Sequence, residues 1–184
     1  MGSSFSTSME PFEINLSRTT KVWSLKNSRS KYRTFEWKLK LPRAFVVRAS
    51  ESIDSEGGIS QHYGIEARID TSGNELVPRT TSGINSTKYK SIGIFMGNYF
   101  SLDNQYCVRQ DENYWVDSKG AKLSRPVACV RTSNRCSIFT NIDGWLYQLD
   151  VSLDLYDDPE KTCSIISSFL EKHTSLRTPF VAQE

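Results

Sequence analysis

The sequence predicts an α+β fold, in which a predominantly antiparallel β-sheet is packed by a C-terminal helix. The strongest indication is an apolar side chain at every second position from Trp145 to Leu155. A similar alternation covers residues 34–41, and an amphipathic helical pattern follows Asp158. A chain of 184 residues is long enough for one domain with a sizeable core. We therefore predict a flexible N-terminal arm over residues 1–10 and a single globular domain over residues 11–184.

The N-terminal quarter of the chain predicts short strands. Phe12, Ile14 and Leu16 alternate with polar residues. The alternation in residues 34–41 is stricter, and its members are Phe35, Trp37, Leu39 and Leu41 on one side, and Glu36, Lys38 and Lys40 on the other. This pattern predicts a half-buried strand with a basic outer face. Pro42 predicts that the strand is an edge strand or ends there.

The middle of the chain predicts loops followed by an antiparallel meander. Residues 50–60 and 71–87 are rich in Ser, Thr, Gly, Asn and Asp, which is typical of loops, and a short strand lies between them at residues 65–69. Aromatic and β-branched runs then predict consecutive strands, at residues 91–100, 105–108, 114–116, 127–130 and 137–140.

The last strand and the helix form the clearest pair of elements. The alternation from residue 145 to 155 predicts a long strand with one apolar face. Asp at the N-cap, Pro159 at the first helical position and Glu160 in the first turn predict a helix start. One face of this helix carries Cys163, Ile166, Phe169, Leu170 and His173. That face is expected to cover the apolar side of the sheet.

The charge of the chain is unevenly distributed. The formal net charge is only +2, but residues 1–50 contain ten Lys and Arg against three Asp and Glu. The basic segment predicts an anionic partner, such as a lipid headgroup surface or a nucleoprotein. The opposite charge in the rest of the chain is compatible with head-to-tail self-association.

The first six residues, Met1 to Ser6, fit the N-myristoylation pattern, with Gly2 as the acceptor. One acyl chain holds a protein to a bilayer only marginally, and the basic segment would supply the second signal. Two other interpretations remain open. Met-Gly-Ser-Ser is also a common vector-derived start, and Met9 is an alternative natural first residue.

The sequence contains no motif for catalysis, metal binding or cofactor binding. No phosphate-binding glycine loop, HExxH or GxSxG occurs. The four cysteines lack metal-ligand spacing, and Asp157 and Asp158 are better explained as helix-capping residues. We therefore expect no enzyme, no metal and no cofactor.

Two segments together resemble a known family. They are the aromatic and basic stretch from Tyr32 to Arg48, and the stretch from Gly144 to Asp158 with its Tyr-Asp-Asp ending and following helix. This combination resembles the C-terminal part of rhabdovirus matrix proteins of the small, plant-infecting type. The Pro-Pro-x-Tyr motif of many animal members is absent. The resemblance implies a matrix-like domain without enzymatic activity, which bridges the inner membrane surface and the viral ribonucleoprotein and polymerises between them.

On this hypothesis the protein occurs in the virion, in the host cytoplasm and at the inner membrane surface. The residues expected to bind the membrane or the nucleoprotein are Arg18, Lys21, Lys26, Arg29, Lys31, Arg33, Lys38 and Lys40. The residues expected to mediate self-association are Phe5, Phe12 and Ile14. Direct contact with nucleic acid would be electrostatic and nonspecific. Two alternatives are a small viral coat protein with a β-sandwich fold and a β-barrel carrier of an apolar ligand.

Overall fold

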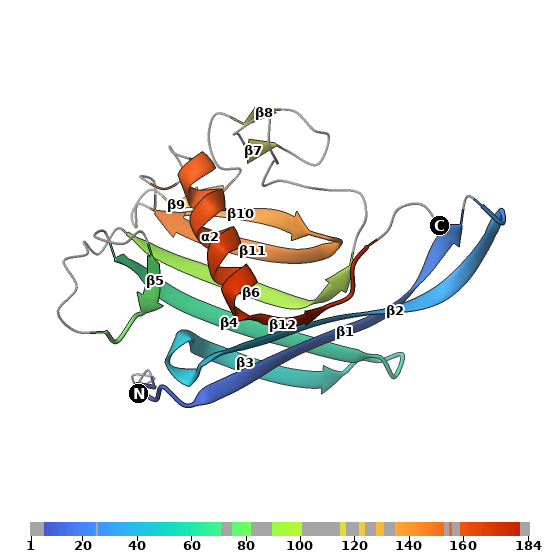
Figure 1. Cartoon of the computed structure of the whole chain (residues 1–184), viewed down its shortest axis with the longest axis horizontal. Helices are drawn as coiled ribbons and strands as arrows, with labels where there is room; N and C mark the ends of the chain where they lie inside the picture. The colour runs from blue at the N-terminus through green and yellow to red at the C-terminus, as the bar shows by residue number, and fades with distance from the viewer. Residues whose placement is uncertain are drawn as a thin grey trace.

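A computed structural model describes residues 6–24, 26–70, 75–81, 90–100, 115–116, 122–123, 128–130, 135–152, 155 and 159–180. These residues confirm the α+β prediction, because antiparallel sheets dominate and α2 (Pro159–His173) packs on them (Figure 1).

The described strands form two main sheets. Sheet A has the order β1–β2–β12, with β1 (Pro11–Ser24), β2 (Arg29–Pro42) and β12 (Thr174–Arg177). Sheet B has the order β3–β4–β6–β11–β10–β9, with β3 (Val46–Ile53), β4 (Ile59–Asp70), β6 (Ser91–Phe100), β11 (Trp145–Ser152), β10 (Arg135–Ile142) and β9 (Ala128–Val130). β5 (Glu75–Pro78) pairs with β4, and β7 (Trp115–Val116) pairs with β8 (Lys122–Leu123). The 3₁₀-helix η1 (Arg43–Phe45) connects the two main sheets.

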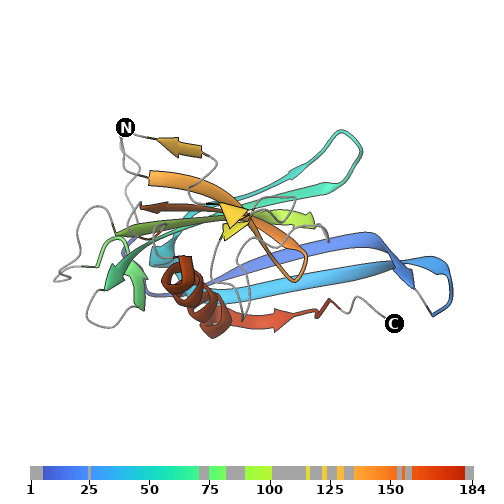
Figure 2. The same ribbon diagram turned by 90° about the horizontal axis from the view of Figure 1, so that it is seen from above.

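The molecule has two layers around one core. Sheet B forms one layer, and α2 and sheet A together cover one of its faces (Figure 2). The alternation of the sequence produces this arrangement directly, since Phe35, Trp37 and Leu39 of β2 are fully buried. The rings of Trp37 and Trp145 lie 6.4 Å apart across the two layers. Burial of this apolar surface is the main driving force for joining the layers.

A tight turn connects β10 to β11. Asp143 and Gly144 both have positive φ, at 48° and 92°, as a type I′ hairpin turn requires. A Cβ atom on Gly144 would lie 2.3 Å from the ring of Phe100. The turn therefore needs glycine for two reasons, its backbone conformation and the closeness of the aromatic ring.

The differences from the predicted elements lie mainly in the middle and at the end of the chain. The prediction of a loop over residues 50–60 is wrong, because β3 continues to Ile53 and β4 begins at Ile59. The turn composition of Asp54 to Gly58 marks only the connection between these two strands. β12 was not predicted, and the expected strand at residues 105–108 lies outside the described residues. The helix begins at Pro159 as expected.

Candidate functional site: two projecting hairpins

The most prominent feature of the fold is a ribbon at the end of the β1–β2 hairpin, which we call the arm (residues 18–34). β1 and β2 pair as far as Ser24 and Arg29. β12 pairs with β2 only at residues 37–39, and the arm beyond it has two strands (Figure 1). Seven residues of β1 give the arm a length of about 20 Å.

The arm is strongly cationic. It contains six Lys and Arg residues and no Asp or Glu, while the remaining chain has 17 Lys and Arg against 21 Asp and Glu. Lys21, Lys26 and Arg29 are exposed, and they form no ion pair with any other residue that the structure describes. The arm thus concentrates charge that the net value of +2 conceals.

The two faces of the arm differ in chemistry. Residues opposite each other in an antiparallel pair share a face, and the register pairs Lys21 with Tyr32 and Trp23 with Ser30. One face therefore carries two exposed aromatic side chains, Trp23 (61% exposed) and Tyr32 (75%), together with Lys21. The other face carries the cations that are paired in register with Thr20, Val22 and Ser24, namely Arg33, Lys31 and Arg29.

The base of the arm is held to sheet B by two buried amide side chains. The backbone N–H of Ser17 donates to Gln61 Oε1 at 3.1 Å. Asn98 Nδ2 donates to the carbonyl oxygens of Ser17 and Ile59, at 3.3 and 2.6 Å, and its Oδ1 accepts from the N–H of Gln61 at 3.1 Å. Since no sheet hydrogen bonds join β1 to β4 or β6, these contacts fix where the arm leaves the molecule.

Tyr63 adds a further contact beneath β1. Burial raises the pKa of its phenol, while the backbone amide of Asn15 lowers it and the negative charge of Glu51 raises it. The phenol is therefore neutral at physiological pH and adds no charge to the base of the arm.

A second hairpin end has the opposite charge. We call residues 51–59 the acidic turn, because they contain Glu51, Asp54 and Glu56 and no Lys or Arg. Asp54 Oδ1 accepts hydrogen bonds from the N–H groups of Glu56 and Gly58, at 2.9 and 2.7 Å, which fixes the turn. Ile53 and Ile59 are cross-strand partners, and they are 78% and 53% exposed. The acidic turn thus combines an exposed aliphatic pair with three carboxylates.

The arm and the acidic turn extend from the same end of the molecule, and both views show them separated from each other (Figures 1 and 2). A cleft of about 460 Å³ lies between the base of the arm and the acidic turn. One wall contains Arg18 and Thr19 of β1, and the other contains Asp54, Glu56 and Ile59. The fold therefore presents two oppositely charged projections with a cleft between them.

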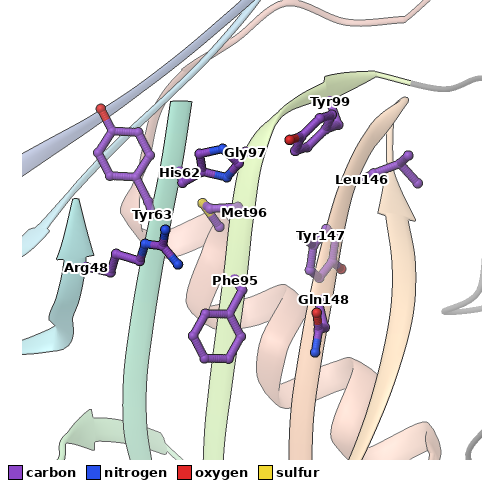
Figure 3. Close-up of a pocket in the computed structure, with 10 residues that line it drawn as sticks. All are labelled: Arg48, His62, Tyr63, Phe95, Met96, Gly97, Tyr99, Leu146, Tyr147 and Gln148. Atoms are coloured by element: carbon purple, nitrogen blue, oxygen red, sulfur yellow. The ribbon is translucent and has the colours of Figure 1, made fainter. Parts of the chain in front are cut away.

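A second hollow of about 290 Å³ lies on the face of sheet B opposite α2 (Figure 3). Phe95, Tyr99 and Leu146 point into it, and His62 and Arg48 lie at its border. The rings of His62 and Tyr99 are 5.7 Å apart, and His62 Nε2 lies 3.0 Å from Ser60 Oγ. The hollow is open at the sheet surface, unlike the enclosed internal cavity that a β-barrel carrier requires.

The structure brings together six of the eight cations that the sequence analysis selected. Arg18, Lys21, Lys26, Arg29, Lys31 and Arg33 all lie on the arm. Lys38 and Lys40 lie instead on the inner part of β2, beside β12 and α2. These two lysines are separated from the arm by Glu36.

Two of the three residues expected to mediate self-association contribute instead to the core of their own chain. Ile14 is fully buried in the core of its own chain, and Phe12 packs against that core. Residues 8 and 10 are held as well, since their carbonyl oxygens accept from the N–H groups of Ala44 and Arg43 at 2.8 Å. Gly2 and Phe5 lie outside the described residues. Among the described residues a self-association surface must therefore be sought elsewhere, and the role of Phe5 stays a prediction.

Sequence reasoning missed the exposed aromatics and the acidic turn. Trp23 has the opposite parity to Ile14, Leu16 and Val22, which already places it on the outer face of β1. The Ser- and Gly-rich composition of residues 50–60 concealed two strands that carry the aliphatic pair outward.

Comparison with known proteins identified no relative: no family model, no curated protein and no solved structure matches the chain. Within the described residues, no helix is long and apolar enough to cross a bilayer. The same residues contain no cluster of His, Cys, Asp or Glu suited to a metal ion.

Proposed function

We propose that the protein is a non-enzymatic structural protein of the viral matrix type, which binds an anionic membrane surface through its arm and associates with itself. The observation that carries the proposal is the combination of six cations with two exposed aromatic side chains on one projecting ribbon. Lys and Arg near an anionic leaflet contribute about 1 kcal/mol each. Trp and Tyr favour the interface between lipid headgroups and acyl chains.

The geometry favours a membrane surface over nucleic acid as the partner of the arm. Base stacking requires aromatic rings that are accessible within a charged groove. Phe35 and Trp37 are fully buried, and Trp23 and Tyr32 are exposed on a projecting two-stranded ribbon. Cations on both faces of a projecting ribbon suit a broad anionic surface better than a single strand. A ribonucleoprotein would then contact the protein through protein surfaces.

The direct test measures binding to vesicles that contain phosphatidylserine, with neutral phosphatidylcholine vesicles for comparison. The test variant is Lys21→Gln/Lys26→Gln/Arg29→Gln. Loss of three charges at about 1 kcal/mol each should weaken binding about 100-fold at low ionic strength. The matched control is Lys40→Gln/Arg48→Gln/Lys172→Gln, which removes the same charge from exposed positions outside the arm. Equal weakening by both variants would show that net charge, and not the arm, determines binding.

Two further comparisons separate the membrane signals. Trp23→Ala/Tyr32→Ala keeps every charge, and it should weaken binding to vesicles but not to heparin, which offers anions without an apolar layer. Gly2→Ala, tested in protein co-expressed with an N-myristoyltransferase, should weaken vesicle binding if the glycine is acylated. Binding to RNA that exceeds binding to vesicles at the same ionic strength would contradict the proposal and favour the coat-protein alternative.

A further inference from the structure

The arm and the acidic turn are complementary in three respects. The arm is positive and the acidic turn is negative, with six cations against three carboxylates. Each also exposes an apolar pair, Trp23 and Tyr32 on the arm and Ile53 and Ile59 on the acidic turn. An exposed apolar pair surrounded by charge is the composition expected for a docking surface.

Both hairpins also have an unpaired strand edge. Ser17 directs its backbone N–H and carbonyl groups away from β2, toward Gln61 and Asn98. By the alternation of a strand, Thr19, Lys21 and Trp23 direct theirs the same way, and there they meet no backbone partner among the described residues. β3 is the edge strand of sheet B, and its residues from Arg48 to Ile53 are exposed.

Charge determines which edges can pair. Pairing β1 of one arm with β1 of another would bring together two ribbons of six cations each. Pairing the arm with an edge that carries Glu51 and leads into Asp54 and Glu56 replaces that repulsion with attraction. Within one chain the acidic turn lies beside only the base of the arm, at Arg18 and Thr19, and the outer part of the arm projects away from it (Figure 2). A second copy is therefore the source of the complementary hairpin for the outer part.

We propose that the acidic turn of one copy docks against the arm of a second copy, with Ile53 and Ile59 covering Trp23 and Tyr32. Because both hairpins extend from the same end of the molecule, a single two-fold axis lets each copy donate its arm and receive the other. The product is a closed dimer. This inference deepens the self-association in the proposed function, and it does not depend on membrane binding.

The test exchanges the two charges. The arm variant is Lys21→Glu/Lys26→Glu/Arg29→Glu/Lys31→Glu, and the turn variant is Glu51→Lys/Asp54→Asn/Glu56→Lys. Asn at position 54 keeps the oxygen that accepts the turn hydrogen bonds. Each variant alone has like charges on both hairpins and should remain monomeric in sedimentation velocity, at concentrations where the wild type dimerises at low salt. An equimolar mixture should recover the dimer, because the altered arm then meets the altered turn.

Recovery in the mixture cannot arise from a folding defect, which makes it the decisive outcome. A mixture that stays monomeric, while both variants keep the wild-type circular dichroism spectrum, would overturn the proposal. So would a wild type that is monomeric at several hundred micromolar in low salt. A mass that rises with concentration beyond two copies would overturn the reciprocal arrangement.

A second comparison tests the apolar part without changing any charge. Ile53→Ser should weaken the dimer about tenfold, since the burial of the aliphatic side chain is lost. The matched control is Met9→Ser, which changes a side chain that is 64% exposed and belongs to neither hairpin. Equal affinities in the two variants would contradict the docking of Ile53.

Measuring vesicle binding of the same variants distinguishes a failure of the docking surface from a failure of the membrane proposal. The turn variant retains all six cations of the arm, and it should bind anionic vesicles at least as well as the wild type. Loss of the dimer with vesicle binding intact supports the docking surface by itself. Loss of vesicle binding in the arm variant, with normal dimers in the turn variant, would contradict the docking surface and leave the membrane proposal standing.

Discussion

Asn98 should be the most important single polar residue for the attachment of the arm. It is 4% exposed, and its amide joins three backbone groups that no strand pairing satisfies. Asn98→Ala leaves the N–H of Gln61 and the carbonyl oxygens of Ser17 and Ile59 without these partners. At about 1 kcal/mol for each lost hydrogen bond, the free energy of unfolding should fall by about 2–4 kcal/mol.

Thermal unfolding monitored by circular dichroism measures this loss. For a domain of this size, about 2–4 kcal/mol corresponds to a decrease of about 5–15 °C in Tm. Asn98→Asp provides a second measurement, because it keeps an acceptor for Gln61 but directs a carboxylate at two carbonyl oxygens. Those carbonyls favour the protonated acid, so that the variant should be less stable at pH 7 and should recover as the pH falls toward the carboxyl's pKa.

A loss below about 0.5 kcal/mol for Asn98→Ala would mean that water entering the cleft replaces the amide at no cost. In that case the arm would be held mainly by the apolar residues of β1. Hydrogen exchange of the Ser17 amide distinguishes the two cases, because it should accelerate in Asn98→Ala only if the amide fixes the base of the arm.

Two further predictions concern the core. Gly144→Ala should lower the free energy of unfolding by about 2–4 kcal/mol in urea titration, because it combines a positive φ with overlap against Phe100. The control is Gly57→Ala, since Gly57 has a similar φ but open space around it. If Gly57→Ala lowers the free energy of unfolding as much as Gly144→Ala does, the overlap with Phe100 is refuted. Burial lowers the pKa of His173 in the folded protein, against the carbonyl of Lys40, which raises it. The unfolded state therefore binds the proton more readily, and Tm should fall as the pH drops below about 6.5. The slope should become shallower in His173→Gln, and an unchanged slope would refute this role.

The sequence allowed the core of the fold to be predicted, because periodicity alone specifies it. The alternation around Trp37 and Trp145 identified two central strands, and the Pro159 signal located the helix. β12 could not be predicted, since its four residues are exposed or half-buried and are in strand conformation only through pairing with β2. Tertiary pairing of this kind leaves no periodic signal in a short segment.

Of the candidate site, the sequence predicted the cations of the arm but not the acidic turn. A count of charges along the chain found the cations of the arm, because six of them are close in sequence. It could not show that Lys38 and Lys40 are separated from them by the start of the β12 pairing. The acidic turn was missed because its role depends on spatial position: it projects from the same end as the arm, although 16 residues lie between Thr34 and Glu51 in the sequence.

The charge of the arm also protects a long β-hairpin whose outer edges are open. A two-stranded ribbon with open edges and exposed aromatic rings is marginally stable, and it is a template for pairing with other chains. Six cations prevent arms from pairing with one another, which is the common protection of edge strands. The same cations leave the edge open to any surface that offers negative charge and apolar contact together. An anionic bilayer and the acidic turn of a second copy both meet that requirement.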